Sequence, residues 1–257
     1  ICSLAFLRRQ RRATTPMIDF TLFRDRSFSA GVATALIASA ALMGMELVVS
    51  QRLQLVVGLS PLQAGLTILP IPLGAFIAGP LAGQALPRLG AERILSASLG
   101  LAAAGALLYL LGYSAAYWIQ LVSFALLGFG VGAAMTAASS AMLLHAPPDR
   151  AGMAASIEEV SYELGGAFGI AVLGSVMSAV YTSAFAAPAS VDAPALARDS
   201  LDGALIAAES LPDSVAAQLI SVAQSAFDSA FVTVMILVAA LLTMAALGIA
   251  LTTRRAR

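Results

Sequence analysis

Six apolar segments dominate this sequence, and each reaches the roughly 20 residues that a helix needs to cross the hydrocarbon core of a bilayer. They cover residues 28–50, 64–86, 94–118, 118–146, 151–184 and 229–252. Only 11% of the residues are charged, against about 25% in soluble domains. Because a bilayer offers no water to backbone N–H and C=O groups, such segments must be helical. The sequence therefore predicts an all-α integral membrane protein with six transmembrane helices.

Three glutamates, Glu158, Glu159 and Glu163, lie inside the fifth apolar segment. An acid at membrane depth costs roughly 2.5 to 3.5 kcal/mol on insertion scales, so it must face a cavity or a partner. A carboxylate in such a place can exchange a bound proton for a lipophilic cation. The alternative is a structural role, in which these acids make polar contacts between helices or lie at the cytoplasmic mouth.

The fifth segment also carries two stripes of polar and small residues when it is drawn as a helix. Glu159, Glu163 and Gly166 recur at spacings of four and three, which places them on one stripe. A neighbouring stripe holds Glu158, Tyr162, Gly165 and Gly169. The spacing of the last two glycines lets another helix approach closely. We expect the acidic stripe to line a wet central pathway and the glycine stripe to pack against a helix.

The arginines predict the orientation of the chain. They cluster before the first segment, in alternate connectors at Arg88, Arg93 and Arg150, and after the last segment, whereas only Arg52 and Arg198 fall on the other side. By the positive-inside rule, both ends of the chain are expected in the cytoplasm. The same rule places an aromatic belt at the outer membrane surface, formed by Tyr109, Tyr113, Tyr117 and Trp118.

The connector of residues 185–228 carries six acids against a single arginine, so we expect it outside the cell. Leucines recur in it at helical spacing, and Pro212 marks the restart of a helix that runs from about residue 213 into the last segment. This pattern predicts an external helical hairpin, and an unstructured acidic loop is the alternative. The expected organisation is the end of a preceding helix and a cytoplasmic connector at 1–27, five transmembrane helices at 28–184, the hairpin at 185–228, and the last helix with a cytoplasmic tail at 229–257.

A second group of candidate site residues lies near the outer half of the membrane. Glu46 is the only other acid at depth, and it could contribute to a substrate cavity. Alternatively, it could be an interfacial acid that extends outward to the membrane surface or pairs with Arg52. Met43 and Tyr162 could form an adaptable pocket for aromatic cations, although such side chains also serve simple packing. No metal-ligand spacing, nucleophile triad or phosphate-binding loop is present, so the sequence predicts neither an enzyme nor a metal site.

Three strings point to one family. GLSPLQAGL at 58–66, followed by Leu69-Pro70, resembles the start of the tenth helix of fourteen-helix drug:proton antiporters in the major facilitator superfamily. LGGAFGIAVLGS at 164–175 resembles the thirteenth-helix motif of those proteins, whose packing glycines here are Gly165, Gly166, Gly169 and Gly174. GQALPRLGAER at 83–93 resembles a cytoplasmic loop motif in which glycines permit a tight turn and basic residues hold helix ends, here Gly83, Arg88, Gly90 and Arg93.

The acid cluster narrows the resemblance. Glu158-Glu159 with Glu163 four residues on is similar to the quaternary-ammonium efflux proteins of that branch. No acid lies between Gln63 and Pro87, where some relatives carry one that admits divalent cations, so monovalent substrates are expected.

The resemblance implies the C-terminal half of such a transporter, built as two three-helix inverted repeats. It implies proton-coupled efflux of hydrophobic cationic drugs across a bacterial inner membrane. The proton gradient would replace any cofactor, and the partners would be the lipid bilayer, the drugs and a missing N-terminal half, with no nucleic acid. Two rivals remain: an exporter of a neutral metabolite or lipid, and a non-transporting membrane scaffold or truncated remnant.

Overall fold

A computed structural model describes residues 19–114, 116–186 and 195–255. Every regular element in these ranges is a helix, and none is a strand. Six helical stretches are long and apolar enough to cross a membrane: Arg26–Val56, Pro61–Leu89, Ala91–Gly112, Tyr117–His145, Pro148–Ala184 and Asp213–Thr252. The prediction of an all-α protein with six spanning helices is therefore confirmed.

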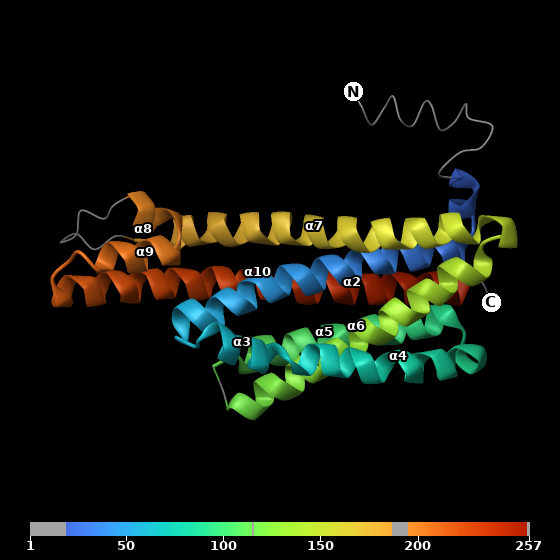
Figure 1. The fold of residues 1–257 in the computed structure, drawn as a ribbon, viewed down its shortest axis with the longest axis horizontal. Coiled ribbons are helices and arrows are strands. Elements are labelled where there is room, and N and C mark those ends of the chain that lie inside the picture. The colour runs from blue at the N-terminus through green and yellow to red at the C-terminus, as the bar shows by residue number, and fades with distance from the viewer. Residues whose placement is uncertain (1–18, 115, 187–194, 256–257) are drawn as a thin grey trace, which may run out of the picture.

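The helices run up and down along one axis (Figure 1). In chain order they are η1 (Phe20–Arg24), α2 (Arg26–Gln51), η2 (Arg52–Val56), α3 (Pro61–Ile68), α4 (Pro70–Leu89), α5 (Ala91–Gly112), α6 (Tyr117–His145), η3 (Pro148–Arg150), α7 (Ala151–Ala184), α8 (Ala195–Asp199), α9 (Leu201–Ala208) and α10 (Asp213–Arg255). We call the end that holds η1 and the last turn of α10 the terminal end. The opposite end, with α8, α9 and the start of α10, is the hairpin end.

Local signals in the sequence set where several helices begin and end. Asp25 caps α2 by accepting a hydrogen bond from the Phe28 N–H at 2.9 Å. Ser60 and Gln63 form a reciprocal capping box at the start of α3. Gly90 has a φ of 79° at the turn between α4 and α5, a conformation that favours glycine. Ser60 and Gly90 lie in short connectors, and short connectors make the spans that they join run antiparallel.

The packing of the six spans follows a two-fold pattern. α2 packs on α7 as α4 packs on α6, and α5 packs on α6 as α10 packs on α2. The three helices α2, α4 and α5 correspond in order to α6, α7 and α10. Under this correspondence, the α2–α7 contact maps onto the α4–α6 contact, and the α5–α6 contact maps onto the α10–α2 contact. Because each triplet has an odd number of spans, matched helices run in opposite directions. This is the arrangement expected of two inverted three-helix repeats.

The core corrects the predicted aromatic belt. Tyr109 is fully buried, and its ring lies 4.5 Å from Phe124 and 6.1 Å from Phe231, measured between centroids. α5 ends at Gly112, so Tyr109 lies one turn inside the helix and points toward α6 and α10. Only Tyr117 and Trp118 are exposed as predicted.

The hairpin before the last span is present. α10 begins at Asp213 and continues without a break for 43 residues, roughly 65 Å at 1.5 Å per residue and more than twice a bilayer core. The short helix α9 lies beside the first turns of α10, and α8 lies against the end of α7 (Figure 1). The predicted connector at residues 1–18 and the acid Asp192 lie outside the described residues.

Candidate functional site

The glycine stripe of α7 packs directly on α2. A Cβ added at Gly165 would overlap the carbonyl oxygen of Leu36, and one added at Gly169 would overlap that of Ala40. The Ser39 hydroxyl donates a 2.7 Å hydrogen bond to the Tyr162 carbonyl across the same contact. The two helix backbones therefore touch along this line, which we call the α2–α7 seam, as the spacing of the glycines predicts.

The other two predicted packing glycines differ in their surroundings. Gly166, placed by spacing on the acidic stripe, is buried in the seam, where a Cβ would strike the Met43 sulfur. Gly174 has room, because the nearest atom to an added Cβ is Leu47 Cδ2 at 3.6 Å. The seam at Gly166 is therefore wider than a single stripe of residues. At Gly174 the two helices are already farther apart, since two straight helices diverge away from their closest approach.

The three glutamates of α7 do not share one environment. Glu159 and Glu163 are exposed, among the exposed side chains of Val160, Leu164 and Phe168. Neither glutamate forms an ion pair or a hydrogen bond with another described residue. They therefore face outward from this bundle, and any pathway that they line must have its opposite wall outside the described residues.

Glu158 and Tyr162 turn the other way, toward α6. Glu158 is half-buried, one helical turn before Tyr162 and within electrostatic reach of its phenol. The Tyr162 hydroxyl donates a 3.2 Å hydrogen bond to the Met135 carbonyl on α6. This phenol therefore links α7 to α6. Tyr162 thus has the helix-packing role that was the alternative to lining a pocket for aromatic cations.

The remaining cavity candidates lie on α2. Met43 is 41% exposed beside Gly166 of α7, and Glu46 follows one turn later, half-buried. The predicted alternative, a pair between Glu46 and Arg52, is wrong because Arg52 points to α10. No described residue bonds to the Glu46 carboxylate, so it remains a candidate for binding a proton or a cation.

An ion pair that sequence reasoning missed closes the hairpin end of the bundle. Arg52, whose side chain is only 8% exposed, donates from Nε to Asp228 Oδ1 on α10 at 3.0 Å. Its guanidinium carbon lies 4.5 Å from the ring centroid of Tyr113 and 5.2 Å from that of Phe231. One cation thereby links α2, α5 and α10. An arginine two residues beyond an apolar segment is a signal that some acid could meet it, but spacing alone does not say which.

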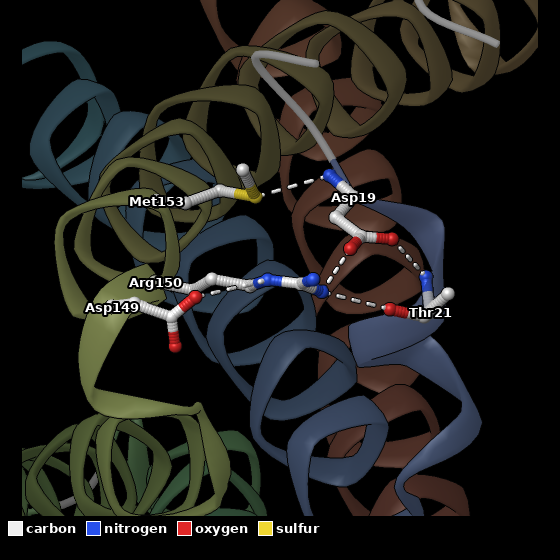
Figure 2. A network of polar contacts seen from close by, with 5 residues as sticks. All are labelled: Asp19, Thr21, Asp149, Arg150 and Met153. Carbon is white, nitrogen blue, oxygen red and sulfur yellow. Dashed lines mark hydrogen bonds and ion pairs between the residues drawn. The ribbon is translucent and has the colours of Figure 1, made fainter. Parts of the chain in front are cut away.

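A second polar network lies at the terminal end (Figure 2). Arg150, just before α7, binds Asp19 and the Thr21 hydroxyl, so the segment preceding α2 is tied to the base of the acid-bearing helix. The Asp19 backbone N–H reaches the Met153 sulfur at 3.0 Å. Hydrogen bonds with the backbone and the side chain of Thr21 lower the pKa of Asp19 below its ordinary value, and the positive charge of Arg150 lowers it further.

The loop motif between α4 and α5 takes a different form from the one expected. Gly90 makes the turn. Gly83 lies inside α4, because that helix continues to Leu89, and a Cβ added at Gly83 would meet no atom within 4 Å. Arg88 and Arg93 are exposed, and neither forms an ion pair with another described residue. The motif thus provides one glycine turn and two free cations.

Six spans in two inverted triplets, with carboxylates on an exposed apolar helix face, define a multi-pass helical membrane protein of the transporter type. Residues 27–253 match the family described as Major Facilitator Superfamily. The chain belongs to this family of membrane transporters, and its predicted non-enzymatic character agrees with that membership.

Individual relatives are named for drug resistance and efflux. The methyl viologen resistance protein SmvA of Salmonella typhimurium is 36% identical over 86% of this chain and 46% of its own length. The multidrug efflux pump LfrA of Mycolicibacterium smegmatis is 34% identical over 97% of this chain and 50% of its own. The tetracenomycin C resistance and export protein of Streptomyces glaucescens is 29% identical over 98% and 48%. The chain spans about half the length of these relatives.

Proposed function

We propose that the chain is the C-terminal half of a fourteen-helix, proton-coupled exporter of hydrophobic cations in a bacterial inner membrane, similar to quaternary-ammonium efflux proteins. Support comes from relatives named for multidrug efflux and from one named for resistance to methyl viologen. Methyl viologen is an organic dication, so it supports a cationic cargo but not the expectation of monovalent substrates. The proton gradient supplies the energy, and no other cofactor is needed. An N-terminal half completes the transporter.

The observation that carries this proposal is the position of Glu159 and Glu163 on the exposed apolar face of α7. Two carboxylates among lipid-like side chains are tolerated only where a cavity or a cation meets them. We place the second wall of that cavity in the N-terminal half, which would cover this face of α7. Met43 and Glu46 on α2 would border the same space.

Coupling follows from competition for one negative site. Glu159 and Glu163 lie one helical turn apart on the exposed face of α7, so a proton and a cargo cation would compete for the same pair of carboxylates. Cargo entering from the cytoplasm displaces that proton, and a proton entering from outside expels the cargo. Moving one unit charge across the membrane is worth about 2.3 kcal/mol per 100 mV.

The experiment is proton release from the purified complete transporter when a quaternary ammonium dye is added. Glu159→Gln and Glu163→Gln should each reduce release and export by about tenfold or more, because glutamine mimics a permanent proton while keeping the shape of the side chain. Glu158→Gln should cost less, since Glu158 lies beside Tyr162 on the α6 side. Undiminished release in both Glu159→Gln and Glu163→Gln would contradict the coupling role.

The orientation has its own test. Arginines gather between spans at the terminal end, and the acids of α8 and α9 lie at the hairpin end, so the positive-inside rule places both chain ends in the cytoplasm. A tag after residue 257 should be protected in intact cells, and one inserted in residues 187–194 should be accessible. Equal accessibility of the two tags would overturn this topology.

One relative favours a second candidate. The Streptomyces glaucescens protein is named for export of tetracenomycin C, which suggests export of a metabolite rather than of cationic drugs. If the complete transporter moves such a compound without proton release, and quaternary ammonium dyes do not compete, this alternative replaces the first.

A further inference from the structure

A cavity of about 190 Å³ opens at the hairpin end, well away from the acid pair of α7. Its walls come from the second halves of α2 and α7, from η2, from the end of α8 and the start of α9, and from α10. Val48, Met177, Tyr181 and Phe227 form a buried apolar and aromatic floor. The cavity lies roughly 16 Å along α7 from Glu163, counted from Gly174 at 1.5 Å per residue.

The rim of this cavity is negative. Asp199 and Asp202 are exposed, line the opening, and form no ion pair with another described residue. Among the residues that the structure describes, no basic side chain lines the cavity. Arg52 is engaged with Asp228 and two aromatic rings, and Arg198 is exposed and absent from the wall. The carboxylates therefore act at the opening without a neutralising partner.

The rim is held in place rather than loosely attached. The Tyr181 hydroxyl donates a 2.9 Å hydrogen bond to the Ala197 carbonyl, which fixes α8 to the end of α7. Ser200 caps α9 by accepting from the Gly203 N–H at 3.0 Å. Both contacts flank Asp199 and Asp202, so the two carboxylates keep a defined position above the aromatic floor.

Gly174 keeps the cavity open. It lines the wall, and a Cβ there would meet only Leu47 at ordinary contact distance, so its lack of a side chain does not serve helix packing as it does at Gly165 and Gly169. A larger side chain at this position would extend into the empty volume without pushing α2 away.

We propose that this cavity is a separate binding site for a small hydrophobic organic cation. The aromatic rings and the Met177 sulfur contact its apolar body and attract its charge, and the two aspartates balance that charge from the rim. Placing this site on an export route, where cargo pauses before release, rests on the proposed function. Cation binding itself is independent of transport.

The test measures benzyltrimethylammonium binding by isothermal titration calorimetry to the purified protein in phosphatidylcholine nanodiscs. The double variant Asp199→Asn, Asp202→Asn should bind about tenfold more weakly, because the rim then lacks the two negative charges that balance the cation. Gly174→Leu should abolish binding by filling the cavity. Glu209→Gln, an exposed acid outside the wall, and Gly65→Leu, at a glycine with nothing within 4 Å of its Cβ position, are the matched controls and should bind normally.

The same measurements separate this site from the proposed function. The site is refuted if the unchanged protein does not bind the cation. It is also refuted if the double variant and Gly174→Leu both bind it as strongly as the unchanged protein does. Either result holds even if dye export is observed. Loss of binding in both, with normal binding in Glu159→Gln and in the controls, supports the site even if the transporter proves not to release protons.

Discussion

Removing the charge of Asp228 should destabilise the bundle far more than its place on the protein surface suggests. In Asp228→Asn the Arg52 guanidinium keeps its ring contacts with Tyr113 and Phe231 but loses its only ion-pair partner among the described residues. Since the Arg52 side chain is 8% exposed, water cannot readily replace the lost carboxylate.

The size of the effect follows from the geometry. Two unit charges about 4 Å apart attract by about 4 kcal/mol at an effective dielectric constant of 20. Asp228 is 37% exposed, so solvent and salt screen part of that attraction. We expect Asp228→Asn to lower the free energy of unfolding by about 2 to 3 kcal/mol. In the double variant Arg52→Met, Asp228→Asn the loss should be smaller, because no buried cation remains unpaired.

Unfolding of the purified protein in detergent, followed by circular dichroism, measures these changes. A double-mutant cycle between Arg52→Met and Asp228→Asn should give a coupling of at least about 1 kcal/mol. Arg198→Met, at an exposed arginine of the same end, is the control and should change stability by less than about 0.5 kcal/mol. Additive single changes, or an Asp228→Asn effect no larger than this control, would refute a buried, energetically important pair.

Three further predictions test the packing and the caps. Gly169→Ala should cost about 1 to 3 kcal/mol because its methyl overlaps the facing α2 backbone, whereas Gly174→Ala should be nearly neutral, and equal effects in thermal unfolding would contradict the seam. Gly90→Ala should cost about 1 kcal/mol at its φ of 79°, whereas Gly83→Ala inside α4 should stabilise by up to about 1 kcal/mol. The lowered pKa of Asp19 means that its contribution to stability is present above the ordinary carboxyl value and is lost as the pH falls through the lowered one. The gap in melting temperature between the unchanged protein and Asp19→Asn should therefore shrink from about pH 6 to about pH 3, and a constant gap would contradict the ion pair with Arg150.

The sequence was sufficient for the number and type of spans and for the start of α10 at residue 213. These features depend on the length and apolarity of single segments and on local breakers such as Pro212, and a bilayer acts on each segment separately. The α2–α7 seam was also predictable on the α7 side, because glycines four residues apart always share a helix face. Which helix would fill that seam was not contained in the spacing.

The tertiary structure decided every feature that joins distant segments. Arg52 meets Asp228, 176 positions away, and not Glu46 on its own helix, and Tyr109 turns into the core instead of the membrane surface. The cavity beneath Asp199 and Asp202 combines residues of six helical elements, α2, η2, α7, α8, α9 and α10. Hydrophobic length determines whether a segment enters the membrane, but lipid interacts about equally well with any apolar helix face. Only the packing of helix against helix selects which polar groups meet and where space remains.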